Sequence, residues 1–327
     1  MASNLEDQLD QHIDAVIAAE KASPSGGSGV SIAPLVEIAS ALRLLPRQNF
    51  KTRLKEELQS SVNRMKASTA DSQAKPTAEG CHTVTPYIAV RNAYELIDFV
   101  KNAFGAEGTI HGTGSKGGIH SEFKIGDSII MIGGGDAWKG TPRITALHYY
   151  VDDVHAVYRK ALEAGATSMN EPLEDHGELV AGVRDVAGNE WYIAKRLSGS
   201  HTDEGLRSVT PYLHPNGSVA LIEFLKQAFA AEAIAVYKSP DGIVQHAKIR
   251  IGDSVIEMGE AHGQWQPLPT MFLLYVDDVD AWHKRAVASG ATSISEPADQ
   301  AYGDRVGAID DSFGNLWYIA TRIADSA

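Results

Sequence analysis

One module occurs twice in this chain, and no other feature of the sequence limits the possible folds so strongly. The phrase Val84-Thr85-Pro86-Tyr87 returns 125 residues later as Val209-Thr210-Pro211-Tyr212. Later matches keep nearly the same spacing: residues 125–128 match 251–254, residues 150–154 match 275–279, and residues 188–194 match 314–320. Matches spread this evenly indicate a duplicated domain rather than one shared motif.

The composition favours a globular protein whose partners are small molecules or other proteins. Hydrophobic residues make up 43% of the 327 residues, which is enough material for packed cores. The net charge of −13 opposes binding to nucleic acid or to an anionic membrane, because phosphates are repelled at long range. The single cysteine, Cys81, excludes an internal disulfide and a cysteine metal cluster.

The N-terminal stretch is acidic and lacks the apolar core of a signal peptide. No run in the sequence approaches the roughly 18 apolar residues that a membrane span needs. We therefore expect a cytoplasmic protein without a membrane partner.

Residues 1–70 have the pattern of a helical N-terminal segment, and residues 71–80 have the composition of a linker. The apolar stripes of this segment are too few to form a core alone. One interpretation is an appendage that packs against the modules. The other is a docking segment for a protein partner through residues 1–67, because amphipathic helices on linkers often serve that purpose.

Each module, 81–198 and 206–324, is predicted to contain a βαβββ unit twice, which makes the fold class α+β. Asn92 is expected to cap a helix over residues 93–104 that Gly105 ends, and Asp152-Asp153 to cap a helix that runs to about Ala164 and that Gly165 closes. The tryptophans and phenylalanines at alternating or helical spacing are expected in the core: Phe99, Phe104, Trp191, Phe224, Phe229 and Trp317. The glycine run 133–135 lacks the spacing of a phosphate loop and is predicted to be a loop over the first sheet.

These phrases resemble the glyoxalase/bleomycin-resistance/extradiol-dioxygenase superfamily, also called vicinal oxygen chelate, and its PhnB-like branch in particular. The resemblance rests on residues 82–90 with 103–107, on residues 241–247 with 251–254, and on residues 302–305 with 311–317. It implies tandem βαβββ-βαβββ modules whose sheets curl into open troughs, with helices outside. The superfamily contains isomerases, dioxygenases, thiol transferases and noncatalytic drug-binding proteins, so function depends on the site.

The resemblance also implies where a metal would bind, on trough-facing strand positions that carry His, Gln or Glu in metal-dependent members. By ungapped matching these positions are Thr85, Met131, Ala146, Tyr192, Thr210, Glu257, Met271 and Tyr318. Only Glu257 binds a divalent ion well, and one carboxylate does not make a three-ligand site. We therefore expect neither a metal nor another cofactor. His148 lies two residues beyond Ala146 on the same strand face, but its counterpart in the second module is Leu273.

Two histidines occupy matched positions on the polar face of a central strand, His120 in the first module and His246 in the second. They are candidates for orienting a ligand or transferring a proton, although a hydrogen-bonded histidine on a wet sheet face is an equally good interpretation. His246 and Glu257 are the candidate catalytic residues. Tyr192 and Tyr318 are expected to face the troughs and contact a ligand.

The loop before the last strands supplies three further ligand-binding candidates, Tyr302, Asp304 and Arg305. An Arg/Asp pair there is suited to clamp an anionic ligand, and a purely structural salt bridge is the alternative. We expect Arg305 to lie within reach of Glu257, so that polar groups gather in the second module.

The favoured function is the binding of a small, partly apolar organic ligand without a metal. An anionic ligand is one form of this hypothesis. One alternative is a metal-dependent isomerase, lyase or dioxygenase of the same superfamily. A second alternative is a scaffold whose N-terminal helices contact another protein. The modules are expected to pair within one chain, as a monomer, or between chains in a homodimer.

Overall fold

The computed structural model describes residues 81–113, 117–263 and 265–323. The predicted N-terminal segment 1–70 and linker 71–80 lie outside the described residues. Among the helices that are described, none has the length and apolar character needed to cross a membrane.

Four consecutive βαβββ units follow one another along the chain, two in each module. Unit 1 contains β1 (Val84–Val90), α4 (Ala93–Phe104), β2 (Glu107–Thr113), β3 (Ile119–Ile125) and β4 (Ser128–Gly134). Unit 2 contains β5 (Ala146–Tyr150), α5 (Val154–Glu163), β6 (Thr167–Asp175), β7 (Glu178–Arg184) and β8 (Glu190–Arg196). After the short helix η1 (His201–Glu204), unit 3 contains β9 (Val209–Leu213), α6 (Ser218–Phe229), β10 (Glu232–Lys238), β11 (Val244–Ile251) and β12 (Ser254–Met258). Unit 4 contains β13 (Met271–Tyr275), α7 (Val279–Ala288), β14 (Thr292–Asp299), β15 (Asp304–Asp310) and β16 (Leu316–Arg322).

The predicted helix ends are largely confirmed. Helix α4 covers residues 93–104 and ends at Gly105, whose φ of 67° suits glycine. Asp153 accepts a hydrogen bond from the backbone N–H of Ala156 at 2.9 Å and so caps α5 as expected. Asn92 behaves differently, because its side-chain amide donates to the carbonyl of Val186 instead of capping α4.

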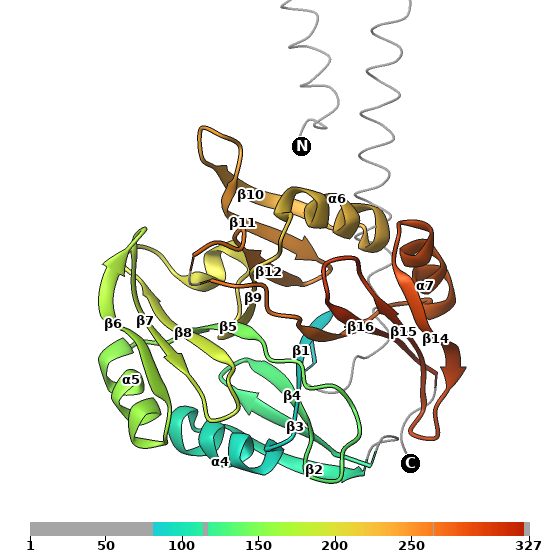
Figure 1. The fold of residues 1–327 in the computed structure, drawn as a ribbon, viewed down its shortest axis with the longest axis horizontal. Coiled ribbons are helices and arrows are strands. Elements are labelled where there is room, and N and C mark those ends of the chain that lie inside the picture. The colour runs from blue at the N-terminus through green and yellow to red at the C-terminus, as the bar shows by residue number, and fades with distance from the viewer. Residues whose placement is uncertain (1–80, 114–116, 264, 324–327) are drawn as a thin grey trace, which may run out of the picture. The chain divides into compact units, whose positions relative to one another are not determined.

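The strands form two eight-stranded sheets, and each sheet takes one unit from each module (Figure 1). Sheet A joins units 1 and 4 through the antiparallel pair β1–β13, with Tyr87 opposite Met271. Sheet B joins units 2 and 3 through the antiparallel pair β5–β9, with Ala146 opposite Tyr212. The two modules therefore pair within one chain by exchanging halves, so every sheet is shared between them.

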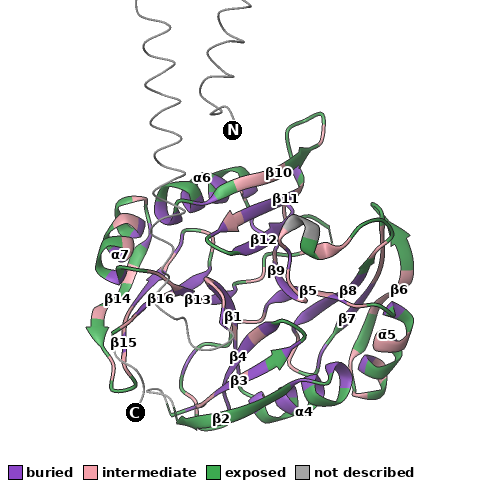
Figure 2. Cartoon of the chain, turned by 180° about the vertical axis from the view of Figure 1, so that it is seen from behind, coloured by how far each residue is buried: buried purple, intermediate pink, exposed green. Residues whose placement is uncertain are grey.

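The hydrophobic cores, in contrast, follow the modules. Helices α4 and α5 pack together over the first core, and α6 and α7 over the second. All six aromatic residues expected in the core are buried, and Trp191 and Trp317 have no exposed surface. Figure 2 shows the central strands buried and the edge strands β2 and β6 exposed. We call the helix-free faces of sheets A and B trough A and trough B.

A repeated turn holds each core tryptophan in place. The carboxylate of Asp185 accepts hydrogen bonds from the backbone N–H of Ala187 and of Asn189 and from the indole of Trp191 at 2.8 to 2.9 Å. The matching residue of the second module, Asp311, bonds to the backbone N–H of residues 313 and 315 and to Trp317 in the same way. The repeated Gly-Asn and Trp phrases thus encode a turn whose buried donors are all satisfied.

The prediction of a loop at residues 133–135 is wrong for the first two of these residues. Gly133 and Gly134 belong to β4, where Gly133 pairs with Ala89 of β1 and with His120 of β3. A Cβ at Gly133 would lie 2.8 Å from the hydroxyl oxygen of Tyr87. Glycine at this position leaves space for the Tyr87 side chain, and it does not serve to bend a loop.

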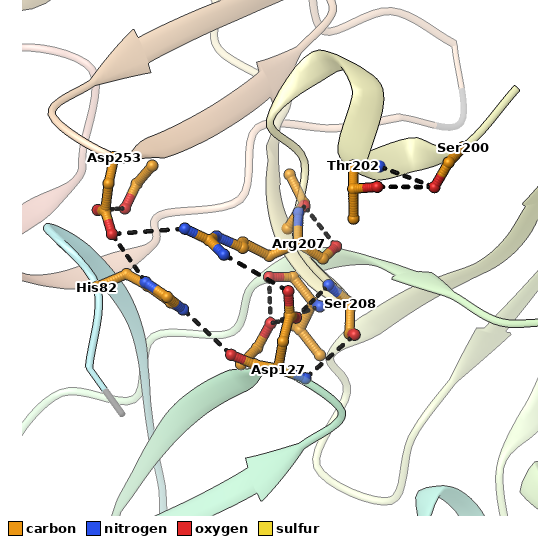
Figure 3. A network of polar contacts seen from close by, with 11 residues as sticks. His82, Asp127, Ser200, Thr202, Arg207, Ser208 and Asp253 are labelled. Carbon is orange, nitrogen blue, oxygen red and sulfur yellow. Dashed lines mark hydrogen bonds and ion pairs between the residues drawn. The ribbon is translucent and has the colours of Figure 1, made fainter. Parts of the chain in front are cut away.

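A symmetric polar network joins the two sheets where β1 and β9 begin (Figure 3). Nδ1 of His82 lies 2.9 Å from Oδ2 of Asp253, and its Nε2 lies 3.1 Å from the backbone oxygen of Asp127. Arg207, at the matching position of the second module, contacts the carboxylates of Asp127 at 3.7 Å and of Asp253 at 3.5 Å. The carboxylate of Asp253 thus faces both basic side chains, whereas Asp127 meets Arg207 with its carboxylate and His82 with its backbone oxygen.

Candidate functional site

Trough B contains a buried acid–base pair drawn from both modules. His148 lies on β5 and Glu257 on β12, on either side of β9 in the sheet (Figure 1). Nδ1 of His148 is 2.6 Å from Oε2 of Glu257, and the two side chains are 10% and 1% exposed. Because β5 and β12 come from different modules, only the exchange of halves brings these two residues together.

Three more side chains surround the carboxylate of Glu257. The hydroxyl of Tyr150 lies 3.2 Å from its Oε2 and donates to it. Nε2 of His246 lies 3.4 Å from Oε1, and Nζ of Lys248 lies 3.9 Å from the same atom. Both oxygens of the buried carboxylate therefore face donors or cations, which is the condition for keeping a charge in the interior.

The surroundings of Glu257 favour its ionised form. Burial, the largest influence, raises its pKa, but the charge of His148 and the hydrogen bonds from His148 and His246 together outweigh burial, so the pKa lies well below its usual range. Burial likewise lowers the pKa of His148, but the charge of Glu257 and the hydrogen bond to it bring the net pKa above 6.5. Each member of the pair therefore stabilises the charged form of the other, the imidazolium of His148 and the carboxylate of Glu257.

A second hydrogen-bonded chain runs beside this pair. The Tyr192 hydroxyl donates to Oε2 of Glu190 at 3.0 Å and lies 2.9 Å from Nε2 of His214. Arg184 donates to the other oxygen of Glu190 at 2.8 Å. Burial, aided by repulsion from His148, lowers the pKa of His214 to about 4. Because the Tyr192 O–H donates to Glu190, Nε2–H of His214 donates to the tyrosine oxygen.

Two donors of the trough face have no hydrogen-bond partner within the described ranges. Only Nδ1 of His148 is engaged by Glu257 and Tyr150, so Nε2–H of the imidazolium is available. The Tyr212 ring lies 4.9 Å from the His148 ring, and its hydroxyl likewise bonds to no described residue. Tyr212 is partly exposed, and His148 beside it is 8% exposed.

The peptide between the modules closes one end of trough B. The ring of His201 in η1 stacks on Tyr150, with centroids 5.0 Å apart and planes 5° apart. Leu206, 1% exposed, packs with Tyr150 and Val255 in a small apolar cluster.

Three of the predicted site residues lie together on one sheet face. Glu257, His246 and Tyr192 all lie on trough B, around His148. His148 was noticed only as a neighbour of an expected metal position, and Tyr150, Tyr212 and His214 were missed. The strand alternation that put Tyr192 on the open face applies equally to these three, because each lies two residues from another trough residue.

The other predicted site residues lie on sheet A. His120 and Tyr318 face trough A, where each is close to Tyr87. The expectation that Arg305 reaches Glu257 is wrong, because β15 and β12 belong to different sheets. Arg305 instead pairs with Asp280 at 2.7 Å and with Asp299 at 2.8 Å, which is the structural alternative.

The neighbours of Arg305 also have other partners. Asp304 is buried and bonds to Arg322 and to the hydroxyl of Tyr275, both at 3.0 Å. Tyr302 is 58% exposed on the same sheet. An Arg/Asp clamp does not form between these residues.

The residues of trough B do not fit the three-ligand metal site that the resemblance implies. In the part of the chain that the structure describes, no three His, Cys, Asp or Glu side chains are arranged to hold a metal ion. Glu257 directs both oxygens at His148, Tyr150, His246 and Lys248. Thr210 at the first-strand position is buried and bonds to the backbone of Arg207.

Two features elsewhere are separate from this site. Burial, with a contribution from Glu122, raises the pKa of Cys81 to about 12, so its thiol is not a nucleophile. A hollow of about 370 Å³, which we call the side hollow, lies where the peptide between β4 and β5 meets unit 4. It is lined by Thr141, Pro142, Arg143, Pro269, Asp310, Asp311 and Gly314.

Comparison with known proteins agrees with this architecture. The family model of the Glyoxalase/Bleomycin resistance protein/Dioxygenase superfamily matches residues 219–319 of the second module. Residues 219–319 therefore belong to this superfamily. Uncharacterized proteins of Mycobacterium bovis and Mycobacterium tuberculosis are each 29% identical over 129 residues, which is 36% of this chain and 85% and 76% of theirs.

A solved structure extends the likeness of the superfamily fold to both modules. Glyoxalase I of Zea mays matches with a TM-score of 0.56 at 12% identity, covering 73% of this chain and 92% of that chain. At this identity the likeness concerns the fold alone. The tandem βαβββ architecture expected from the sequence is therefore confirmed, and the chemistry has to come from the trough residues themselves.

Proposed function

We propose that the chain binds a small acidic organic molecule in trough B and does so without a metal ion or another cofactor. The observation that carries this proposal is the His148–Glu257 pair, with 2.6 Å between Nδ1 and Oε2 and almost no exposed surface. Burying two charges costs several kcal/mol per ion before their attraction is counted. Trough A has Leu273 and Met131 at the matching positions, so the fold itself does not require the pair.

The positions of the donors support an acidic ligand. Glu257 holds the imidazolium of His148 by Nδ1, which directs Nε2–H away from the carboxylate. The hydroxyl of Tyr212 is a second donor beside it, with ring centroids 4.9 Å apart. A carboxylate that accepts from both groups replaces the water that otherwise solvates them, and hydrogen bonds to charged groups are worth about 1.5 to 3 kcal/mol each.

Aromatic rings supply the apolar part of the proposed site. Tyr192 and Tyr212 make an edge contact, with centroids 5.5 Å apart, and both lie against the His148 ring. Such rings bury a hydrocarbon body while their hydroxyls stay polar. The proposed ligand thus combines one anionic group with a small apolar or aromatic body.

Matched pairs of small molecules test the proposal. We would measure the melting temperature of the full chain with benzoate, phenylacetate and short aliphatic carboxylates, each compared with its neutral amide. We expect at least one acid to raise the melting temperature while its amide does not. A ligand at 100 times its dissociation constant stabilises the folded state by about 2.7 kcal/mol, which is readily measured.

The matched control removes both members of the His148–Glu257 pair together. The double variant His148→Leu with Glu257→Met gives trough B the residues that trough A already has. We expect this variant to fold and to lose the response to acids. The proposal fails if no acid stabilises the natural chain, or if the double variant responds equally well.

Three further predictions remain proposals of the same kind. A protein partner for residues 1–67 is to be tested by pull-down with that segment. The cytoplasmic location rests on the composition and the acidic N-terminal stretch. A monomer with intrachain pairing is supported by the two shared sheets, and its mass in solution distinguishes it from a homodimer.

A further inference from the structure

Trough A repeats the architecture of trough B with different chemistry. Tyr87 of β1 matches Tyr212, and Tyr318 of β16 matches Tyr192, so the aromatic frame is kept. Met131 and Leu273 stand where trough B has its buried acid–base pair. The centre of trough A is consequently apolar.

Four partly exposed side chains line this apolar centre. The ring of Tyr87 lies 6.0 Å from Tyr318 at 42° and 5.7 Å from His120 at 70°. Trp138, from the peptide between β4 and β5, packs with Tyr87 and Tyr318 over the buried residues Ala89, Met271, Ala308 and Leu316. A partly exposed group of rings over an apolar floor is a surface that favours an aromatic guest.

The polar groups of trough A are already paired with one another. The Tyr87 hydroxyl lies 3.1 Å from Nδ1 of His120, whereas the matching hydroxyl of Tyr212 bonds to no described residue. Burial lowers the pKa of His120, so the ring is neutral around pH 7. A neutral hydrogen-bonded pair offers no charge to an anionic guest.

The charged groups at the rim are also paired. Asp304 bonds to Arg322 at 3.0 Å, and Asp310 bonds to Arg143 at 2.8 Å. Arg143 and Asp310 border the side hollow, and their opposite charges act on Tyr318 with opposite effects on its pKa. The charges that border the side hollow are therefore paired with each other.

We propose that trough A is a second binding site and that it takes an uncharged aromatic molecule. The guest lies against Tyr87, Tyr318 and Trp138, on the floor that Met131 and Leu273 complete. One chain then holds two ligands of different chemistry, because each trough combines one unit from each module but only trough B acquired the acid–base pair.

Trp138 forms a wall of this site, and its indole fluorescence can be used to detect a bound guest. A Cβ at Gly140 would lie 2.2 Å from the indole, and one at Gly118 would lie 2.9 Å from it. The indole therefore sits in a slot between two glycine backbones. Arg91 donates to the Trp138 carbonyl at 3.1 Å and fixes the peptide. A guest beside this indole changes its fluorescence.

The test uses the neutral fluorescent probe N-phenyl-1-naphthylamine with the full chain. We expect saturable binding, with energy transfer from Trp138 that is lost in Trp138→Phe. The variant Met131→Glu with Leu273→His places the charged residues of trough B in trough A. It should weaken the affinity for the probe about tenfold or more, equivalent to about 1.4 kcal/mol. Tyr318→Leu removes one partly exposed ring and should weaken the probe about threefold, whereas Tyr318→Phe should retain it.

The control is the double variant His148→Leu with Glu257→Met in trough B, which should not weaken the probe at its original site. If Met131→Glu with Leu273→His does not fold, the Tyr318 variants decide the question alone. The proposal is overturned if the natural chain does not bind the probe, or if binding falls only in the trough B variants. Loss of acid binding in trough B has no influence on this result, so the two proposals fail separately.

Discussion

Nδ1 of His148 lies 2.6 Å from Oε2 of Glu257, and the two residues are separated by 109 positions in the chain. The contact exists because the modules exchange halves, so that β5 of the first module and β9 of the second join in one sheet. An internal duplication thereby produced two troughs from four similar units. The two troughs differ at this point, because Leu273 and Met131 of trough A occupy the positions that match His148 and Glu257.

Breaking this pair on one side should cost more than removing it entirely. Glu257→Gln leaves the imidazole of His148 buried without its counter-charge, and such changes cost about 3 to 5 kcal/mol. The double variant His148→Leu with Glu257→Met restores an apolar contact and should cost far less. Urea unfolding followed by circular dichroism measures both. A Glu257→Gln variant within about 1 kcal/mol of the natural chain would contradict the ionised pair.

The contribution of the pair to the stability of the fold should also depend on pH. The pKa of Glu257 is depressed from 4.5, so its contribution is complete above pH 4.5 and is lost as pH falls toward the depressed value. The pKa of His148 is raised from 6.5, so its contribution is complete below pH 6.5 and is lost as pH rises past the raised value.

The measurement for this prediction is the melting temperature from pH 4 to pH 9, in the natural chain and in the double variant, with the difference plotted against pH. We expect a plateau between the two unfolded-state values, 4.5 and 6.5, and a decline on both sides. A difference that does not change with pH would mean that the pair is not charged.

Local sequence patterns were sufficient to predict the elements of this fold. The apolar spacing of residues 93–104 and the glycine after them gave the bounds of α4, and alternation put Tyr192 and Tyr318 on the open faces. These features depend only on neighbours in the chain. They require no knowledge of which unit pairs with which.

The pairing of the units was not predictable in this way. Because β1 and β9 carry nearly the same residues, the alternation pattern is satisfied by pairing within a module or across modules. The placement of Arg305 beside Glu257 failed for this reason, since it assumed that both ends of the second module share one trough. His148 was passed over as a partner of Glu257 for the same reason, because the contact crosses between modules.

The repeated turn offers a test of the fold itself. Asp185→Ala removes the acceptor for the backbone N–H groups of Ala187 and Asn189 and for the indole N–H of Trp191, of which the last two are buried. Orphaned buried donors cost about 1 to 3 kcal/mol each, so we expect a loss of about 3 kcal/mol or more. Asp185→Asn keeps an acceptor and should lose less. Thermal unfolding measures the series, with exposed Val186→Ala as the control, and equal stability of all variants would contradict the role of the turn.

The stability of the junction between the sheets should depend on pH through His82. The residue at the matching position of the second module suggests a substitution that removes this dependence. The hydrogen bond to Asp253 raises the pKa of His82 against the opposing effect of burial, with help from the backbone oxygen of Asp127. Its stabilisation is therefore complete below pH 6.5 and is lost as pH rises past the raised value. Both partners are partly exposed, so we expect a contribution of about 0.2 to 1 kcal/mol.

The matching position holds Arg207, whose guanidinium stays charged and faces the same two aspartates. His82→Arg should therefore raise the melting temperature at pH 8 relative to the natural chain and leave it nearly unchanged at pH 6. His155→Arg adds the same charge at an exposed position of α5 away from the junction and is the control. If His82→Arg shifts the melting temperature equally at both pH values, or if His155→Arg reproduces its effect, the change reflects net charge, and protonation of His82 does not hold the junction.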